Sequence, residues 1–323
     1  MIYTPTQEPQ EEDPNDHAKR PQALEPCHES PNRERRVPMI KNILFPVDFS
    51  RSCAAMATYV RRAAGIFGSR VTLVHVCDLA SHNGFELYVR SLQNIAEEHW
   101  SIAQHKLDSF LESEFPLANC PRILRSGEAA TQIAEVARTG GFDLIVMPTH
   151  ADRFRRMLLG STTAKVLNDA DCPILTTEHA ETRTPRALEH RIWVCAIGLN
   201  QDSERVLRLA SRAAAEAHAK LSVIHAIHDS ALGPIRFLNQ EQFGSAEEND
   251  ARRRLEELQK TIGCEATIRI ASGPVREALL DAARRSDADL LIIGRTPRSG
   301  VLGRMRDLTY GLVRDSPFPV LSV

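Results

Sequence analysis

Residues 41–76 read KNILFPVDFSRSCAAMATYVRRAAGIFGSRVTLVHV, and this stretch decides the fold. A short apolar run from Ile43 to Val47 gives way to an alanine-rich segment from Ser52 to Phe67, and a second apolar run follows from Val71 to Val76. Short apolar strands that alternate with amphipathic helices are typical of βαβ units, whose parallel strands are buried on both faces. The stretch therefore predicts an α/β domain with a parallel sheet.

The same alternation continues to the C-terminus. A helix is expected from Thr131 to Arg138, because Ile133, Val136 and Ala137 fall on one face. Two insertions, Asn83 to Phe115 and Asn239 to Ile262, each predict a longer, mixed-charge helix that covers the sheet and faces solvent. The further strands are expected at Arg122 to Leu124, Leu144 to Met147, Pro173 to Thr177, Ile192 to Ile197, Leu221 to Ile227, Ala266 to Ile270, Leu290 to Ile293 and Pro319 to Val323.

The chain repeats itself. Asp48 falls on Gly198 and His75 on His225 at a spacing of 150, whereas Gly127 falls on Gly273 and Pro173 on Pro319 at a spacing of 146. The change of spacing is explained by a middle insertion that is four residues shorter in the second copy. Two repeats of this size indicate duplicated domains and not a solenoid.

Four segments follow from this reading. Residues 1–38 carry seven prolines among polar residues, so a disordered tail is expected. Residues 39–178 and 191–323 are the two predicted domains, and 179–190 form a polar linker between them.

Composition excludes several classes of protein. A formal net charge of -2 gives no overall attraction to nucleic acid or to an anionic membrane. No apolar run approaches the length of a membrane span, and residues 1–38 do not resemble a secretory signal, so we expect a cytoplasmic protein. The seven cysteines include no CxxC pair, which argues against a disulfide framework and against a zinc site.

Candidate binding residues lie where the predicted strands end. In an open parallel sheet, ligands bind outside the carboxyl ends of the strands. The Gly160-Ser161 step begins a predicted helix, and free amides and hydroxyls at a helix start suit a phosphate. The predicted site consists of Pro46, Val47, Asp48, Val76, Met147, Thr149, His150, Gly160, Ser161 and Thr162, with Gly294 at the matching point of the second copy.

From Lys41 to Val323 the sequence resembles the universal stress protein family, twice. The resemblance is carried by Ile-Leu-Phe-Pro-Val-Asp-Phe-Ser at 43–50, Leu-Val-His-Val at 73–76, Asp-Leu-Ile-Val-Met-Pro-Thr-His at 143–150 and Leu-Leu-Gly-Ser-Thr-Thr-Ala-Lys-Val-Leu at 158–167. It implies two tandem five-stranded α/β domains of the nucleotide-binding α-hydrolase-like type, with strand order 3-2-1-4-5. It also implies an intramolecular pseudo-dimer that pairs through the strands at 173–177 and 319–323. In one branch, the family binds ATP through a motif G-x2-G-x9-G-[S/T].

The sequence departs from that motif in both copies. In the first copy, Pro148 and Ala151 replace the first two glycines, and only Gly160-Ser161 and Asp48 match. Proline has no amide hydrogen for a phosphate, and alanine resists the positive φ that glycine permits. In the second copy Gly294 is kept, but Pro297, Arg306-Asp307 and Gly198 differ from the pattern.

Arginines in the same loops offer an alternative set of anion ligands. Guanidinium groups could replace the missing amides, or they could form a solvated basic face. The arginines concerned are Arg153, Arg155, Arg156, Arg295, Arg298, Arg304 and Arg306.

Several single residues also have two readings. Asp48 could contact a ligand or cap the helix that begins near Ser50. His75 and His225 could be ligands, but hydrogen-bonded histidines at the edge of the core are the favoured reading, and His150 is left open. Cys172 is expected to be a buried packing residue, since no cation adjacent in the sequence would lower its pKa.

These expectations lead to one favoured function. It is a stress-response regulatory protein that binds ATP, or another adenine nucleotide or anion, in the first domain, with Mg²⁺ accompanying the nucleotide and without a catalytic residue or a protein-held metal. The alternative is an interaction scaffold that binds an unidentified protein partner or another anion, and a slow nucleotide hydrolase ranks third. The sequence leaves open whether the chain also forms a homodimer.

Overall fold

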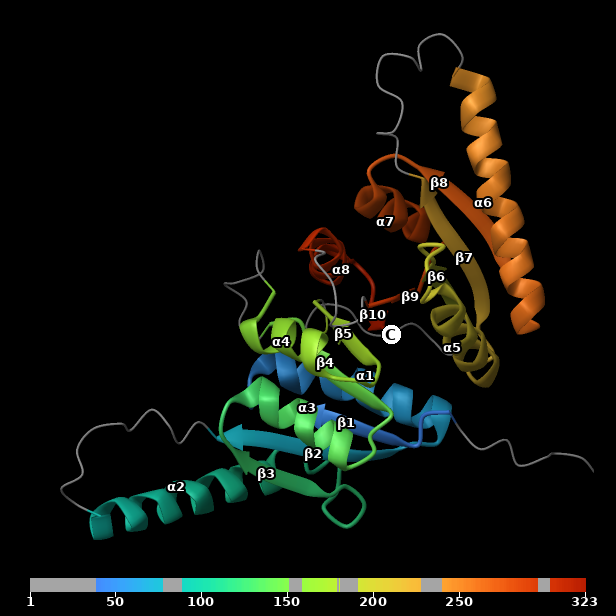
Figure 1. Ribbon diagram of the computed structural model, residues 1–323. Coiled ribbons are helices and arrows are strands. Elements are labelled where there is room, and N and C mark those ends of the chain that lie inside the picture. The colour runs from blue at the N-terminus through green and yellow to red at the C-terminus, as the bar shows by residue number, and fades with distance from the viewer. Residues whose placement is uncertain are drawn as a thin grey trace, which may run out of the picture. The chain divides into compact units, whose positions relative to one another are not determined.

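The computed structural model describes residues 39–77, 89–150, 159–178, 180, 191–227, 240–295 and 303–323, with side chains left out at 89–96, 240–245 and 303–307. We call residues 39–178 the first half and 191–323 the second half. Each half alternates strands and helices in the predicted order (Figure 1). The first-half elements are β1 (Asn42–Pro46), α1 (Arg51–Phe67), β2 (Arg70–Cys77), α2 (Val89–Ser109), β3 (Arg122–Ser126), α3 (Ala129–Thr139), β4 (Leu144–Pro148), α4 (Ser161–Asp169) and β5 (Ile174–Thr177).

The second half repeats this order. Every predicted strand is present, with ends that differ by a few residues. For example, β5 and β10 begin one residue after Pro173 and Pro319. These prolines have no N–H, and their carbonyls accept hydrogen bonds from the N–H groups of Ile145 and Leu291. The second-half elements are β6 (Ile192–Ala196), α5 (Ser203–Glu216), β7 (Lys220–Ile227), α6 (Gln240–Ile262), β8 (Thr267–Ser272), α7 (Val275–Arg285), β9 (Leu290–Ile293), α8 (Gly303–Asp315) and β10 (Val320–Ser322).

The two halves share one ten-stranded sheet of order β3-β2-β1-β4-β5-β10-β9-β6-β7-β8. Within each half the strands are parallel, and the order 3-2-1-4-5 is confirmed in both. The halves meet through an antiparallel pair, in which Thr176 is opposite Val320 and Leu175 is opposite Leu321. The predicted pairing of the two edge strands is therefore confirmed, and neither of them is left as an exposed edge.

Apolar side chains leave the sheet alternately on its two faces and build two core layers. Ile43 and Phe45 pack on the face that α1, α2, α5 and α6 cover. Leu44, between them, packs on the opposite face with residues of α3, α4, α7 and α8. This alternation is the period of two that a strand buried on both faces requires.

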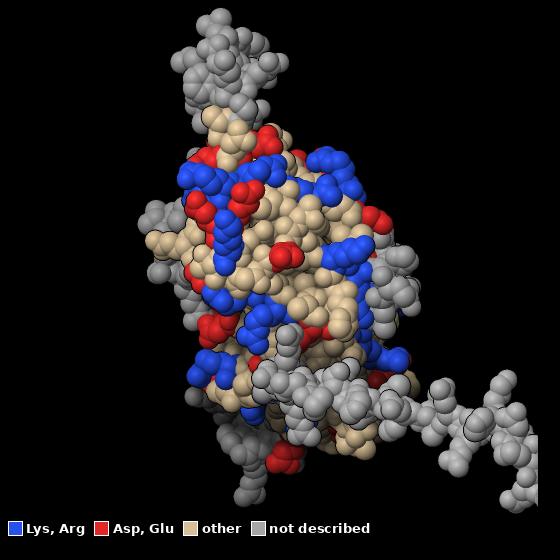
Figure 2. Space-filling model, turned by 90° about the vertical axis from the view of Figure 1, so that its right-hand side faces the viewer, with Lys and Arg blue, Asp and Glu red and all other residues tan. Residues whose placement is uncertain are grey.

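Helix α6 has the mixed charge that its sequence predicts. Arg253 pairs with Asp250 and with Glu257, and Arg252 pairs with Glu248. Figure 2 looks onto the side on which α6 lies in Figure 1, and there basic and acidic side chains are intermixed around uncharged residues. Among the described residues, no helix combines the length and the apolar character that a membrane span needs.

The backbone also shows the duplication. Phe49 and Leu199, which are 150 residues apart, both take a left-handed conformation, with φ of 63° and 52°. Gly127 and Gly273, which are 146 apart, both have φ of 127°. A non-glycine residue in the left-handed region costs about 1–2 kcal/mol. Both halves nevertheless have such a residue, Phe49 or Leu199, in the turn after the first strand.

Candidate functional site

A cavity of about 520 Å³ lies at the carboxyl ends of β1, β2 and β4. Its walls are completed by the first residues of α3 and α4. Nine of the predicted site residues line it: Pro46, Val47, Asp48, Val76, Met147, His150, Gly160, Ser161 and Thr162. Three segments that are far apart in the sequence are thus brought around one space, which we call the first-half cavity.

The turn from β1 to α1 fixes Asp48 at the rim of this cavity. Oδ1 of Asp48 accepts a hydrogen bond from the backbone N–H of Ser50 at 2.9 Å. The N-cap of α1 is Ser50 itself, whose Oγ accepts from the N–H of Cys53 at 3.1 Å. The reading of Asp48 as the helix cap is therefore wrong. The left-handed Phe49 moves the helix start past Asp48, whose carboxylate steadies the turn.

His75 holds the same turn from the neighbouring strand. Its Nδ1 donates to the carbonyl of Val47 at 2.7 Å, and its ring lies 4.3 Å from the ring of Phe49. Phe49 in turn packs against Phe110, and the ammonium of Lys106 lies 4.4 Å above its ring. Burial lowers the pKa of His75, and Lys106 adds to the effect, so the neutral imidazole with a proton on Nδ1 is favoured.

His225 repeats this bond in the second half. Its Nδ1 lies 2.7 Å from the carbonyl of Ile197. The reading of both histidines as hydrogen-bonded residues at the edge of the core is confirmed. Within the part of the chain that the structure describes, no three His, Cys, Asp or Glu side chains are grouped as metal ligands.

The start of α4 presents backbone amides to the first-half cavity. Gly160 is the N-cap, and glycine, which has no side chain, makes no side-chain cap hydrogen bond there. The N–H of Gly160 donates to the carbonyl of Thr149 at 2.9 Å, and a Cβ at Gly160 would lie 3.0 Å from that same oxygen. A larger residue at this position would crowd that carbonyl, which would have to shift slightly. Thr163 ties the first turn to β4, because its hydroxyl donates to the carbonyl of Pro148 at 3.0 Å.

Helix α3 begins beside the same cavity but satisfies its own N-terminus. The carboxylate of Glu128 accepts from the N–H of Thr131 at 2.8 Å and also pairs with Lys165 at 2.9 Å. The Thr131 hydrogen bonds and Lys165 lower the pKa of Glu128 to about 2. The positive end of α3 is therefore neutralised from within the chain, whereas among the described residues no carboxylate binds the first turn of α4.

Two predicted site residues lie elsewhere. Thr149 is buried behind the wall, where its hydroxyl pairs with Nδ1 of His150 at 2.9 Å. Gly294 lines a separate cavity of about 240 Å³ at the matching strand ends of the second half, together with Asn200, Ser203 and His225. The structure therefore does not join the second-half glycine to the first-half residues.

Arg295 is not available as an anion ligand. It follows Gly294, and its guanidinium donates to the carbonyls of Leu167 and Ala170 at 2.9 Å and of Cys172 at 2.7 Å. It binds the C-terminal end of α4, where backbone carbonyls attract a cation. The other arginines of these loops, and Ala151, Pro297 and Asp307, lie outside the described residues or have side chains that do.

Cys172 was expected to be a buried packing residue, but the structure places its side chain only half-buried. A cation does lie near it, since Arg295 is close in space though far away in the sequence. Burial outweighs this charge and raises the pKa of the Cys172 thiol to about 11, and the side chain is half-buried. The raised pKa fits a packing role, but the expectation of full burial is wrong.

The apolar wall of the first-half cavity was not predicted as part of the site. Ala129 and Ile133 of α3, with Leu159 and Val74, face the cavity beside Val76 and Met147. Helical spacing placed Ile133 on a core-facing stripe, but only the packing of α3 beside β2 turns part of that stripe toward the strand ends.

Comparisons with known proteins agree with this fold. The Universal stress protein family matches residues 39–177 and 190–323. Universal stress protein MJ0577 of Methanocaldococcus jannaschii is 26% identical over 157 residues, which is 43% of this chain and 96% of that protein. Universal stress protein A homolog 2 of Coxiella burnetii is 26% identical over 107 residues, 33% of this chain and 73% of the relative.

Two solved structures superpose on both halves of this chain. A universal stress protein from Archaeoglobus fulgidus superposes with a TM-score of 0.61 at 20% identity, covering 87% of this chain and 97% of its own. A protein of unknown function from Pseudomonas aeruginosa, PA1789, gives 0.57 at 18% identity, covering 88% and 92%. These likenesses show a shared fold. Because the family matches the chain twice and over most of its length, the chain belongs to the universal stress protein family as a tandem member.

Proposed function

We propose that this chain is a stress-response regulator that binds one adenine nucleotide, ATP, in the first-half cavity. The observation that carries the proposal is the uncapped start of α4 at Gly160 and Ser161, which lies on a cavity of about 520 Å³ with Asp48 on its rim. Cavities that hold small molecules commonly have volumes of about 300–1,000 Å³.

The chemistry of the wall suits the parts of a nucleotide. The amides of Ser161 and Thr162 and the Ser161 hydroxyl would hold phosphate oxygens, favoured by the positive end of α4. The carboxylate of Asp48 would accept from ribose hydroxyls. Val47, Val76 and Ile133 form an apolar surface for a base.

The departures from the family motif limit the number of phosphate donors. Pro148 belongs to β4, has no N–H, and uses its carbonyl to accept from Thr163. The phosphate contacts would therefore be concentrated on the start of α4, and Mg²⁺ would arrive with the nucleotide. We expect binding without turnover, since His150, which lines the cavity, is already paired with Thr149.

One nucleotide per chain is the expected stoichiometry. The second-half cavity is smaller, at about 240 Å³, and the guanidinium of Arg295 beside it is committed to carbonyls of the first half. Gly198 stands where the first half has Asp48, and the carboxylate that lines the second-half cavity is that of Asp202 at the start of α5 instead.

Replacement of Ser161 tests the proposal most sharply. Ser161 is the first residue of α4, where proline is tolerated, and Gly160 before it has φ of -58° and ψ of 139°, which a following proline accepts. Ser161→Pro removes one amide donor and one hydroxyl at little cost in stability. With Mg-ATP at a hundred times its dissociation constant, the unmodified chain should gain about 2.7 kcal/mol of stability, measured by thermal denaturation.

Ser161→Pro should lose this gain, and Ser161→Ala, which keeps the amide, should lose part of it. Ser109→Ala, on the exposed side of α2, is the matched control and should respond like the unmodified chain. An unmodified chain that shows no shift at millimolar Mg-ATP would favour the interaction scaffold. Steady phosphate release that Ser161→Pro abolishes would favour the hydrolase.

A further inference from the structure

Strand β8 forms one edge of the ten-stranded sheet, and among the described residues its strand partner is β7 alone. It runs between α6 and α7, which cover opposite faces of the sheet (Figure 1). In a parallel pair, every second residue of a strand points both its backbone groups toward the same neighbour. The N–H of Gly273 donates to the carbonyl of Ile227 on β7, which fixes this series. The N–H and C=O groups of Ile268 and Ile270 belong to the other series and face the open edge.

A groove of about 300 Å³ lies along this edge and is lined by residues of β8, α6 and α7. The two isoleucines pack toward the core layer under α6, whereas Ala271 belongs to the layer under α7. Since side chains alternate along a strand, Arg269 lies on the α7 face, where Arg285 also lines the groove. Arg252 of α6 lines the other side. We call this the edge groove.

The charged side chains that line the edge groove are three arginines, and none of the described lining residues is acidic. Arg252 lies 3.4 Å from the carboxylate of Glu248, in an exposed pair one turn away on α6. Arg269 and Arg285 are both exposed, and within the part of the chain that the structure describes neither makes a hydrogen bond or an ion pair. Two guanidinium groups beside an open strand edge are therefore available to a partner.

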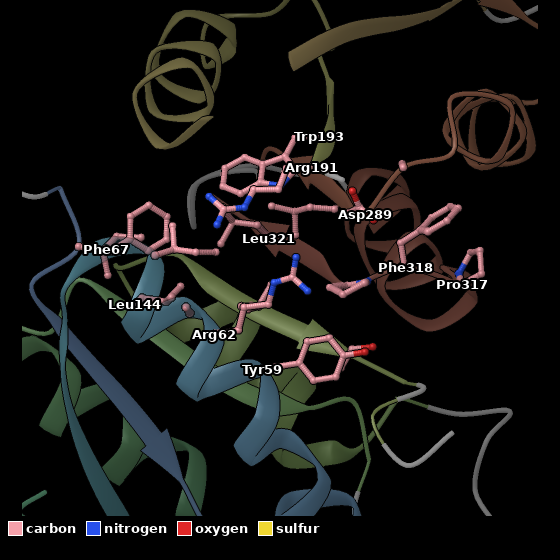
Figure 3. A pocket seen from close by; sticks show the side chains of 18 residues that line it. Tyr59, Arg62, Phe67, Leu144, Arg191, Trp193, Asp289, Pro317, Phe318 and Leu321 are labelled. Carbon is pink, nitrogen blue, oxygen red and sulfur yellow. The ribbon is translucent and has the colours of Figure 1, made fainter. Parts of the chain in front are cut away.

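Other arginines of the second half are engaged within the chain. Arg295 donates to backbone carbonyls of the first half. Arg191 lines a cavity of about 310 Å³ at the junction of the two halves (Figure 3), and its guanidinium donates to the carbonyl of Ala217. The two arginines on the α7 face of the edge groove have no such acceptor among the described residues.

The arginines of the edge groove are not a product of the repeat. At the spacing of 146 that holds for this part of the chain, Arg269 matches Ile123 and Arg285 matches Thr139. At the opposite edge of the sheet, the guanidinium of Arg122 on β3 is bound to two backbone carbonyls. The available positive charge therefore distinguishes one edge of the sheet from the other.

We propose that the edge groove binds an extended acidic segment of a partner protein, which adds to the sheet as a further strand beside β8. Its backbone pairs with Ile268 and Ile270, and acidic side chains at every second position meet Arg269 and Arg285 on the α7 face. The side chains between them face α6 and are uncharged, because Arg252 on that side already has Glu248.

This mode of binding matches the chemistry of the groove. A peptide that adds a strand to a sheet edge takes its affinity from main-chain hydrogen bonds and its specificity from alternate side chains. Guanidinium groups bind carboxylates in a bidentate manner. The proposal is independent of nucleotide binding, because the edge groove shares no lining residue with the cavities at the strand ends.

A short labelled peptide tests the proposal on the full-length chain. The fluorescein-labelled peptide ETEVET alternates acidic and β-branched residues and has about the length of one strand. Its fluorescence anisotropy should rise saturably at submillimolar chain. The scrambled peptide EEETTV should bind about threefold more weakly or worse, since its acids do not share one face. N-methylation of alternate amides should abolish binding in one frame and leave it in the other, because only one set of peptide amides faces β8.

Arginine variants locate the carboxylates. Arg269→Gln and Arg285→Gln should each weaken ETEVET about threefold, as the loss of one exposed ion pair does, and the double variant about tenfold. Arg125→Gln is the matched control, since Arg125 is an exposed arginine of β3 at the opposite edge, and it should bind like the unmodified chain.

Four results would overturn the proposal: no saturable binding, equal affinity for EEETTV, no effect of N-methylation in either frame, or unaltered affinity in the double variant. A further result would replace it. If Arg269→Gln makes the chain self-associate in sedimentation while its affinity for ETEVET is unchanged, the arginines serve to keep the edge from pairing with a second copy, and the proposal is wrong.

Discussion

Arg295 follows Gly294 at the end of β9 and donates to three backbone carbonyls of the first half. Leu167 and Ala170 lie at the last turn and the C-cap of α4, where carbonyls have no partner within the helix. A guanidinium is suited to this position because its donors spread over several acceptors and its charge complements the negative end of the helix dipole. The tie also connects the second-half cavity, which Arg295 lines, with the helix whose other end lines the first-half cavity.

Arg295→Ala should therefore destabilise the protein by about 2–4 kcal/mol, because three carbonyls lose charge-assisted hydrogen bonds in a partly buried place. The measurement is the urea midpoint of the full-length chain. Arg284→Ala is the matched control. Arg284 is exposed and pairs with Asp281 one turn away on α7, so its loss should cost less than about 0.5 kcal/mol. Equal effects of the two substitutions would contradict the role assigned to Arg295.

Helices α3 and α4 differ at their first turns although both border the first-half cavity. Glu128 caps α3, and its depressed pKa records the amide, the hydroxyl and the ammonium that its carboxylate binds. A group whose pKa is lower in the folded chain stabilises the fold above its unfolded pKa and loses that contribution as the pH falls. For Glu128 this window runs from about 4.5 down to about 2.

Glu128→Gln should cost about 0.5–1 kcal/mol at pH 7, as the loss of an exposed cap and ion pair does. The difference from the unmodified chain should shrink between pH 5 and pH 3, since protonation weakens the same carboxylate in the unmodified chain. Urea midpoints across this range measure it. Glu135→Gln, which removes an exposed partner of Arg138 on the same helix, serves as the control and should show a smaller difference at pH 7. A Glu128→Gln difference that stays constant down to pH 3 would contradict the assignment.

The sequence was sufficient for the elements of this fold, because apolar runs and helical spacing are local signals. The internal repeat indicated two copies of the same unit, and the family resemblance added both the strand order within each half and the pairing of β5 with β10. The N-cap of α1 is Ser50 and not Asp48, because the left-handed Phe49 lies between the strand end and the helix start. A pattern of polar and apolar residues does not reveal such a backbone conformation. The role of Arg295 was unpredictable for another reason, since its acceptors lie 123 to 128 residues away along the chain.

The residues of the candidate sites fall into the same two groups: those that a local sequence signal predicts and those that depend on contacts between distant segments. The residues of the first-half cavity could be listed in advance, because a parallel sheet gathers the ends of its strands at one edge. The apolar wall formed by Ala129 and Ile133 depends on how α3 packs against the sheet. The cavity of about 310 Å³ at the junction of the two halves is formed only once β4, β5, β6, β9 and β10 have come together. Contacts of this kind carry no signature in a single sequence.

The antiparallel pair of β5 and β10 makes one continuous sheet from two halves. Arg295 after β9 and Tyr310 of α8 both donate to backbone carbonyls of α4 in the first half. We expect the halves to unfold together for this reason. In Trp193→Phe, the emission of Trp100 on α2 should lose its folded value at the same urea concentration as the circular dichroism of the whole chain, because coincident transitions mark a two-state process.

Leu321→Asp places a carboxylate at a junction position that is 5% exposed, opposite Leu175, and should separate the two transitions because an unpaired charge is costly to bury. Leu117→Asp in the first half, at a leucine that is 47% exposed, is the matched control and should leave them coincident. If the two transitions are already separate in the Trp193→Phe chain without a further substitution, the two halves fold independently and their pairing adds little to the stability of either.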